Sequence, residues 1–157
     1  MRRIVRRCAD VADRLGMSVS KIPKMIYTAM TDTIGGRESG VARSSDGVLD
    51  IRFCTPGSTG IGTNPEQLLA AAWSASFASA IARAAFERKI AFAGQVRVRG
   101  EVEIDVEPDG YDLSVRLRVC LPGIEGSLAQ LLIDEAHQLC PFSKSIGRGL
   151  AVSVELN

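Results

Sequence analysis

Histidine is nearly absent from this sequence, since His137 is the only one among its 157 residues. The four cysteines form no Cys-x-x-Cys pair and do not have the spacing of zinc ligands with that histidine. The formal net charge is only +1, so the composition provides no electrostatic attraction to nucleic acid or to an anionic membrane. The sequence therefore predicts no metal centre, no nucleic-acid partner and no membrane partner.

Long hydrophobic runs are missing as well. No apolar run approaches the roughly 20 residues that a bilayer-spanning helix needs. The basic start, Met1–Arg7, is not followed by the apolar segment of a secretory signal. We therefore expect a cytoplasmic protein, in which scattered cysteines are usually free and buried. Cys8, Cys54 and Cys120 are interpreted in this way.

The chain is long enough to bury a core, and its 46% hydrophobic content is ordinary for a globular protein. We expect residues 1–23 to form an N-terminal extension, with a helical spacing of apolar residues, and residues 24–157 to form one domain. Apolar segments at 25–31, 40–43 and 48–53 are separated by glycine-containing turns. They predict an antiparallel meander at the start of the domain.

A long hairpin is predicted further along, over 96–106 and 113–119, where apolar and charged residues alternate strictly. Acids and arginines should pair across its exposed face. A final strand is predicted over 150–156. These segments favour a mainly antiparallel sheet.

Two helices complete the predicted α+β fold. The first covers about residues 63–89, where Pro65 suits the first turn and Glu66 favours the positive helix end. This helix is apolar on nearly every side, so we expect a sheet or a second subunit to surround it. The second covers 127–139, with Ser127 as its N-cap.

Four segments together carry a resemblance to a known family. They are Gly35-Gly36-Arg37, Ser45-Asp46-Gly47-Val48-Leu49, Thr63-Asn64-Pro65-Glu66-Gln67-Leu68 and His137-Gln138-Leu139-Cys140-Pro141. In this order they resemble the organic hydroperoxide resistance branch of the OsmC/Ohr family, over about residues 24–157. The resemblance implies an OsmC-like α+β fold with antiparallel sheets wrapped around a long buried central helix. It also implies an intertwined homodimer with its site at the subunit interface.

The same resemblance implies roles for four positions. In the family, a cysteine at the place of Ser76 attacks an organic hydroperoxide and becomes a sulfenic acid, and a second cysteine, matched by Cys140, resolves it to a disulfide. Arg37 matches the arginine that stabilises the thiolate, and Glu66 matches the glutamate that orients this arginine. The implied reductant is a lipoyl-type dithiol, a dihydrolipoyl protein, and no bound cofactor is implied.

Ser76 departs from the family pattern. A serine hydroxyl does not ionise near neutral pH, and an oxygen nucleophile opens an O–O bond far less readily than a thiolate does. The sulfenic acid and disulfide steps then lack their first residue, so we expect an impaired or inactive peroxidase. Three explanations stay open: an engineered substitution, natural divergence to a non-catalytic protein, or a reaction in which Cys140 acts alone.

Each of these residues also has a purely structural interpretation. Ser76 would be a small residue at a helix contact, Glu66 a helix-start acid, Arg37 a surface turn residue, and Cys140 and His137 structural residues at a helix end. Two further functions compete with the reductase scaffold. One is a non-catalytic OsmC-like protein that binds a lipophilic ligand or hydroperoxide. The other is a serine hydrolase, which is disfavoured because the sequence lacks a Gly-x-Ser-x-Gly elbow and has a single histidine.

Overall fold

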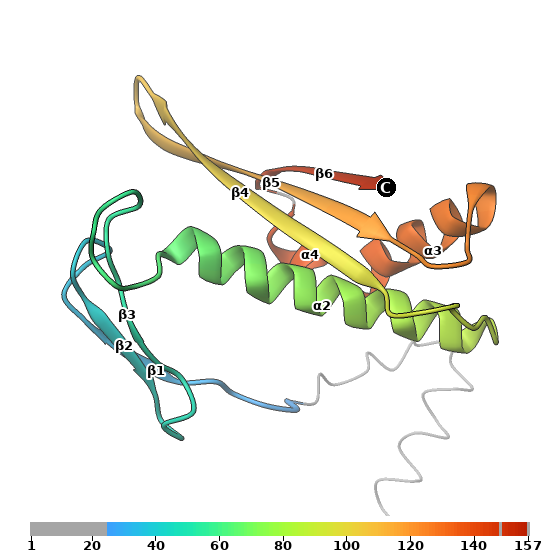
Figure 1. The fold of residues 1–157 in the computed structure, drawn as a ribbon, viewed down its shortest axis with the longest axis horizontal. Coiled ribbons are helices and arrows are strands. Elements are labelled where there is room, and N and C mark those ends of the chain that lie inside the picture. Colours follow the sequence, from blue (N-terminus) through green and yellow to red (C-terminus); the bar gives the residue numbers. More distant parts are fainter. Residues whose placement is uncertain (1–24, 148, 157) are drawn as a thin grey trace, which may run out of the picture. The chain divides into compact units, whose positions relative to one another are not determined.

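The structure is a computed structural model that describes residues 25–147 and 149–156 (Figure 1). The chain divides into two compact units after Thr31. The expected N-terminal extension over 1–23, together with Cys8, lies outside the described residues.

The described part of the first unit differs from its prediction. Residues 25–30 are exposed and have no regular secondary structure. The strand predicted over 25–31 is therefore wrong except at its last residue, where β1 begins (Thr31–Ile34). Apolar and β-branched residues favour a strand, but a strand also needs a neighbour for its backbone hydrogen bonds. Within the described part of the chain, no strand pairs with residues 25–30.

A small three-stranded sheet opens the second unit, in the order β1, β2 (Val41–Ser44) and β3 (Asp50–Arg52). β2 and β3 are antiparallel, with Val41 opposite Arg52. Gly35 starts the turn between β1 and β2 with a φ of +80°, which a residue with a side chain adopts only at a cost. The short strands predicted over 40–43 and 48–53 are confirmed.

The central helix α2 (Pro65–Glu87) begins as its sequence predicts. The side chain of Asn64 accepts a hydrogen bond from the backbone N–H of Gln67 at 2.8 Å, which caps the helix. Its side chains Trp73, Phe77 and Ile81 are fully buried, whereas Phe86 near its C-terminal end is 79% exposed. The opposite face of the helix is exposed and consists mostly of small residues: Ala71, Ala72, Ala75, Ser79 and Ala82. Within one chain, the sheet that contains β4 (Arg97–Glu107) and the helix α3 (Gly126–Leu139) therefore cover one side of α2, and the expectation of a sheet or a second subunit around the helix is met on that side by the chain itself.

By length and composition alone, α2 is the one helix among the described residues that is long and apolar enough to cross a membrane. This differs from the expectation that no apolar run in the chain approaches that length, because scattered serines still leave the segment apolar on average. Core helices of soluble proteins pass the same test. The packing of α2 against β4 and α3 is that of a core helix.

The second sheet contains β4 (Arg97–Glu107), β5 (Gly110–Cys120) and β6 (Ala151–Leu156), in that order. β4 and β5 form the predicted antiparallel hairpin, and α2 runs along it in Figure 1. The predicted pairing of acids and arginines on its charged face is confirmed, for example between Arg118 Nη1 and Glu101 Oε1 at 2.7 Å.

β6 differs from the antiparallel expectation because it pairs with β5 in parallel, with Ser114 opposite Ala151. The chain between these strands forms two helices, α3 (Gly126–Leu139) and α4 (Pro141–Ser145). Such a helical crossover returns the chain to the sheet in the same direction, which an alternation pattern alone does not reveal. α3 starts after Glu125, and Ser127 is therefore not its N-cap.

One core joins these elements. It contains the buried face of α2, the inner face of β5 and the inner face of α3, and its members include Trp73, Phe77, Leu117, Leu132 and Cys140. Cys140 is fully buried although it lies at a helix end. The core therefore extends to the α3–α4 junction.

Candidate functional site

Arg37 and Glu66 form an ion pair although 29 residues of sequence separate them. Arg37 lies in the turn after β1, and Glu66 lies in the first turn of α2, where the positive end of the helix dipole favours an acid. The side chain of Glu66 is only 16% exposed and that of Arg37 is 39% exposed. The carboxylate therefore fixes the guanidinium at the start of the central helix.

A pocket of ≈ 340 Å³ lies beside this ion pair. Its polar lining consists of Arg37, Asn64, Glu66 and Gln67, and its apolar lining comes mainly from Ala70 of α2 and from β4. β4 approaches α2 closely because Gly100 has no side chain: a Cβ there would lie 2.7 Å from the carbonyl oxygen of Ala70. A charged rim and an apolar wall suit an amphipathic molecule with one polar end.

The second pair of predicted site residues is also in contact. Ser76 Oγ lies 3.5 Å from Cys140 Sγ, and either atom could donate the hydrogen bond. Ser76 is half-buried on α2, whereas Cys140 is fully buried between α3 and α4. The backbone of Cys140 is held on both sides, because its N–H donates to the Ala136 carbonyl at 2.8 Å and its carbonyl accepts from Lys144 at 3.1 Å.

The two pairs do not meet within one chain. Glu66 and Ser76 lie ten positions apart on the same helix, which corresponds to a rise of about 15 Å along its axis. Arg37, held by Glu66, therefore lies far from Ser76 and Cys140 of the same chain. A site that needs all four residues is incomplete in a single copy.

His137 packs edge-on against Phe77, with ring centroids 5.0 Å apart. Burial lowers the pKa of His137, and the nearby negative charge of Asp134 only partly opposes this. The imidazole is therefore mainly neutral at neutral pH. This environment agrees with the interpretation of His137 as a structural residue at the end of α3. The contact that holds its ring is the aromatic packing against Phe77.

The free cysteines differ from the expectation that they are buried. Cys54 and Cys120 are only half-buried, and Cys140 is the fully buried one. Cys54 follows the edge strand β3 and Cys120 ends β5, so each lies where its strand leaves the sheet. Among the described residues, no group of histidine, cysteine and carboxylate side chains has the geometry of a metal site.

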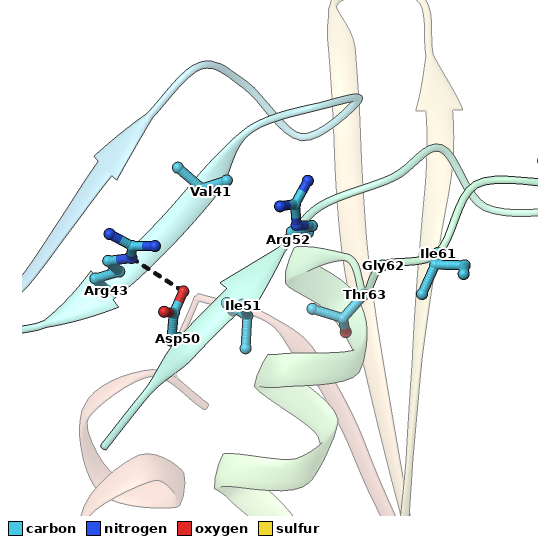
Figure 2. A pocket seen from close by; sticks show the side chains of 8 residues that line it. All are labelled: Val41, Arg43, Asp50, Ile51, Arg52, Ile61, Gly62 and Thr63. Atoms are coloured by element: carbon cyan, nitrogen blue, oxygen red, sulfur yellow. Dashed lines mark hydrogen bonds and ion pairs between the residues drawn. The ribbon is translucent and has the colours of Figure 1, made fainter. Parts of the chain in front are cut away.

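A pocket that the sequence did not indicate lies on the first sheet. It has a volume of ≈ 500 Å³ and is lined by Val41, Arg43, Asp50, Ile51, Arg52, Ile61, Gly62 and Thr63. Figure 2 shows the ion pair of Arg43 and Asp50, joined at 3.1 Å, on one side of it. It contains no nucleophile next to a base, and Ile61 is 95% exposed. We therefore interpret this pocket as an exposed part of the sheet surface and not as a catalytic site.

Sequence reasoning missed one contact near Cys140. Trp73 Nε1 donates a hydrogen bond to Ser143 Oγ at 3.3 Å, and the Trp73 ring packs against Phe142 with centroids 6.0 Å apart. Ser143 directly follows Cys140, Pro141 and Phe142 in the sequence. This nearness to the candidate site residue Cys140 was the available signal.

Known proteins resemble this chain closely. Residues 57–155 match the family model described as OsmC-like protein. The chain is 40% identical over 137 residues to the organic hydroperoxide resistance protein of Xanthomonas axonopodis pv. citri (strain 306), and the match covers 85% of this chain and 96% of that protein.

Solved structures show the same similarity. The crystal structure of OhrB of Bacillus subtilis has a TM-score of 0.77 and 34% identity, covering 83% of this chain and 98% of that chain. An organic hydroperoxide resistance protein from Legionella pneumophila has a TM-score of 0.79 and 34% identity, covering 85% and 99%. They confirm the expected α+β fold of two small sheets and a central helix. The chain therefore belongs to the OsmC/Ohr family.

Proposed function

We propose that this chain has the scaffold of a thiol-dependent organic hydroperoxide reductase, and that Ser76 leaves it impaired or inactive. The contact that carries the proposal is the 3.5 Å distance between Ser76 Oγ and Cys140 Sγ. It joins the two positions that the family resemblance pairs as attacking and resolving groups. The names of the relatives support a role in peroxide detoxification.

The chemistry that this geometry would support needs a thiolate at position 76. That sulfur would attack the distal oxygen of the hydroperoxide, so an S–O bond forms, the O–O bond breaks, and the alkoxide leaves as an alcohol after taking a proton. The resulting sulfenic acid would condense with the Cys140 thiol, releasing water and forming a disulfide. A dihydrolipoyl dithiol would then reduce the disulfide by thiol–disulfide exchange.

Serine cannot start this sequence. Its hydroxyl stays protonated at neutral pH even next to a guanidinium, and it forms no sulfenic acid. Cys140 remains as a thiol, but its complete burial withholds it from a bulky hydroperoxide. The protein should therefore consume organic hydroperoxides slowly or not at all.

We propose further that the complete site is formed by a homodimer. The exposed face of α2 carries small residues, among them Ala71, Ala75 and Ser79, which allow another helix to approach closely. Two such helices packed in opposite directions would place the Arg37–Glu66 pair of one copy beside Ser76 of the partner subunit. This arrangement closes the gap of about 15 Å that separates the pairs in one chain.

The decisive experiment is restoration of the thiol. Ser76→Cys, supplied with cumene hydroperoxide and dihydrolipoamide, should gain peroxidase activity well above that of the unmodified chain. Ser74→Cys is the matched control, because Ser74 is on the same helix but bonds to the backbone oxygen of Ala71 at 3.1 Å. If a folded Ser76→Cys protein turns over no faster than Ser74→Cys, the reductase scaffold is the wrong interpretation.

A second candidate function is favoured by the pocket beside Arg37, which combines a cation with an apolar wall. A non-catalytic protein could hold a lipophilic ligand or hydroperoxide there. A hydrophobic ligand panel that raises the melting temperature of the unmodified chain would favour binding, since a ligand stabilises the state to which it binds. Loss of that shift in Arg37→Ala would assign it to this pocket.

A further inference from the structure

The helix α4 is short, and little of it is buried, yet it directly follows the buried thiol. It has five residues, and none of them is fully buried. An isolated helix of this length is unstable in water. Its position, and that of the preceding Cys140, must therefore be fixed by contacts with other elements.

Two contacts with α2 fix this position, and the contacting residues have the same spacing on both segments. Trp73 and Ser76 are three residues apart on α2, so they lie on one face of that helix, one turn from each other. Cys140 and Ser143 are also three residues apart. Ser76 contacts Cys140 at 3.5 Å, and Trp73 donates to Ser143 at 3.3 Å. The two segments therefore run side by side in opposite directions, joined at two points.

The Trp73 contact is the more specific of the two. Trp73 is fully buried, and a buried indole N–H needs an acceptor. Ser143 Oγ provides it, while the Phe142 ring packs against the indole. Any sliding or rotation of α4 would leave this N–H unsatisfied inside the core.

We propose that Trp73 and Ser143 are positioning residues that set the register between α2 and the α3–α4 junction, and thereby hold the Cys140 sulfur against position 76. This inference deepens the proposed function, on which its relevance to peroxide reduction rests. It assigns no contact with substrate to either residue.

The test measures disulfide formation rather than peroxide turnover. In the Ser76→Cys background, the protein is equilibrated with mixtures of reduced and oxidised glutathione, and the oxidised fraction is read by alkylation and mass spectrometry. Oxidation of the two thiols to a disulfide converts one glutathione disulfide into two glutathione molecules. The measured equilibrium constant reports how well the two sulfurs are held together.

Adding Ser143→Ala or Trp73→Phe should each lower that equilibrium constant roughly tenfold, which is about 30 mV for a two-electron couple. The double variant should lose little more than either single variant, because each already breaks the same bond. Ser143→Thr, which keeps the hydroxyl, should restore the constant. Ser74→Ala is the matched control, since Ser74 bonds to the backbone oxygen of Ala71 in its own helix.

An unchanged equilibrium constant in folded Ser143→Ala and Trp73→Phe proteins would overturn the proposal, as would an equal drop in Ser74→Ala. Failure of a folded Ser76→Cys protein to form the disulfide would overturn it too. If the disulfide forms and depends on Ser143 but hydroperoxide is not reduced, the positioning role stands and the proposed function fails.

Discussion

Position 76 differs from the family pattern by one atom, because an oxygen stands where the resemblance implies a sulfur. Ser76 Oγ lies 3.5 Å from the sulfur of a fully buried cysteine, Cys140, which is the contact on which the proposed function rests. A hydroxyl at this position can donate a hydrogen bond to Cys140 or accept one from it, but a peroxide cannot oxidise it as it oxidises a thiolate to a sulfenic acid. Under the proposed function, serine at this position would keep a side chain of similar size and lack the reactive thiolate.

His137 gives a prediction at the same scale. Burial lowers its pKa in the folded protein, so below its ordinary value the unfolded chain binds more protons than the folded one. The free energy of unfolding should therefore rise with pH through the window from the lowered pKa up to about 6.5, and this contribution should be complete above it. His137→Gln should flatten that dependence. The measurement is urea unfolding across this range.

Asp134→Asn is the informative companion variant. Its carboxylate partly opposes the lowered pKa of His137, so its removal should lower the pKa of His137 further and steepen the pH dependence. A stability profile of His137→Gln that matches the unmodified chain throughout this window would contradict the prediction.

At the scale of elements, the contact between β4 and α2 depends on Gly100. A Cβ at this position would lie 2.7 Å from the carbonyl oxygen of Ala70 and 3.3 Å from its Cα. Both are backbone atoms, which cannot move aside as a flexible side chain can. The wall of the pocket beside Arg37 is formed where this close approach occurs.

Gly100→Ala should therefore destabilise the protein by about 1–3 kcal/mol, the usual range for forcing extra volume into a packed contact. Chemical denaturation measures this loss. Gly94→Ala is the control, since a Cβ there would only touch the Pro122 side chain at 3.5 Å. Equal stability of the two variants would show that β4 can shift away from α2 without cost.

The elements also show what the sequence could and could not predict. The start of α2 at Pro65 and the β4–β5 hairpin follow from local patterns, which short-range physics determines. The parallel pairing of β6 and the missing strand over 25–30 depend on neighbours distant in sequence, and no alternation pattern encodes these. α3 begins at Gly126 rather than after a Ser127 cap, and its N-cap residue Glu125 makes no side-chain capping hydrogen bond.

The site residues divide in a similar way. Arg37, Glu66, Ser76 and Cys140 were selected by resemblance, and the structure brings them together in two pairs. Their roles remain predictions. The separation of the pairs follows only from helix geometry. The motif around Cys140 pointed to Ser143, but its partner Trp73 lies 70 positions away and no local pattern indicates it.

For the whole molecule, the proposed dimer predicts complementation between two inactive chains. Ser76→Cys combined with Arg37→Ala should be inactive because its thiol lacks the cation, and the unmodified chain should be inactive because it lacks the thiol. Refolding the two together should restore hydroperoxide reduction, since mixed dimers would contain one complete site. The measurement is the turnover rate of the mixture against each chain alone.

One variant controls this experiment. Arg43→Ala in place of Arg37→Ala should leave the Ser76→Cys protein active without mixing, because Arg43 pairs with Asp50 on the first sheet, away from Glu66. A mixture that stays inactive while a sedimentation experiment shows dimers would contradict the shared site.

The location of Cys140 in the crossover between β5 and β6 also has a consequence for how the chain reaches its native state. Its contact with Ser76 spans 64 positions, and contacts that close such long loops form late and slowly during folding. The thiol becomes fully buried only when the crossover has docked on α2. Protection of Cys140 from an alkylating reagent should therefore report when the crossover docks on α2, without any added label.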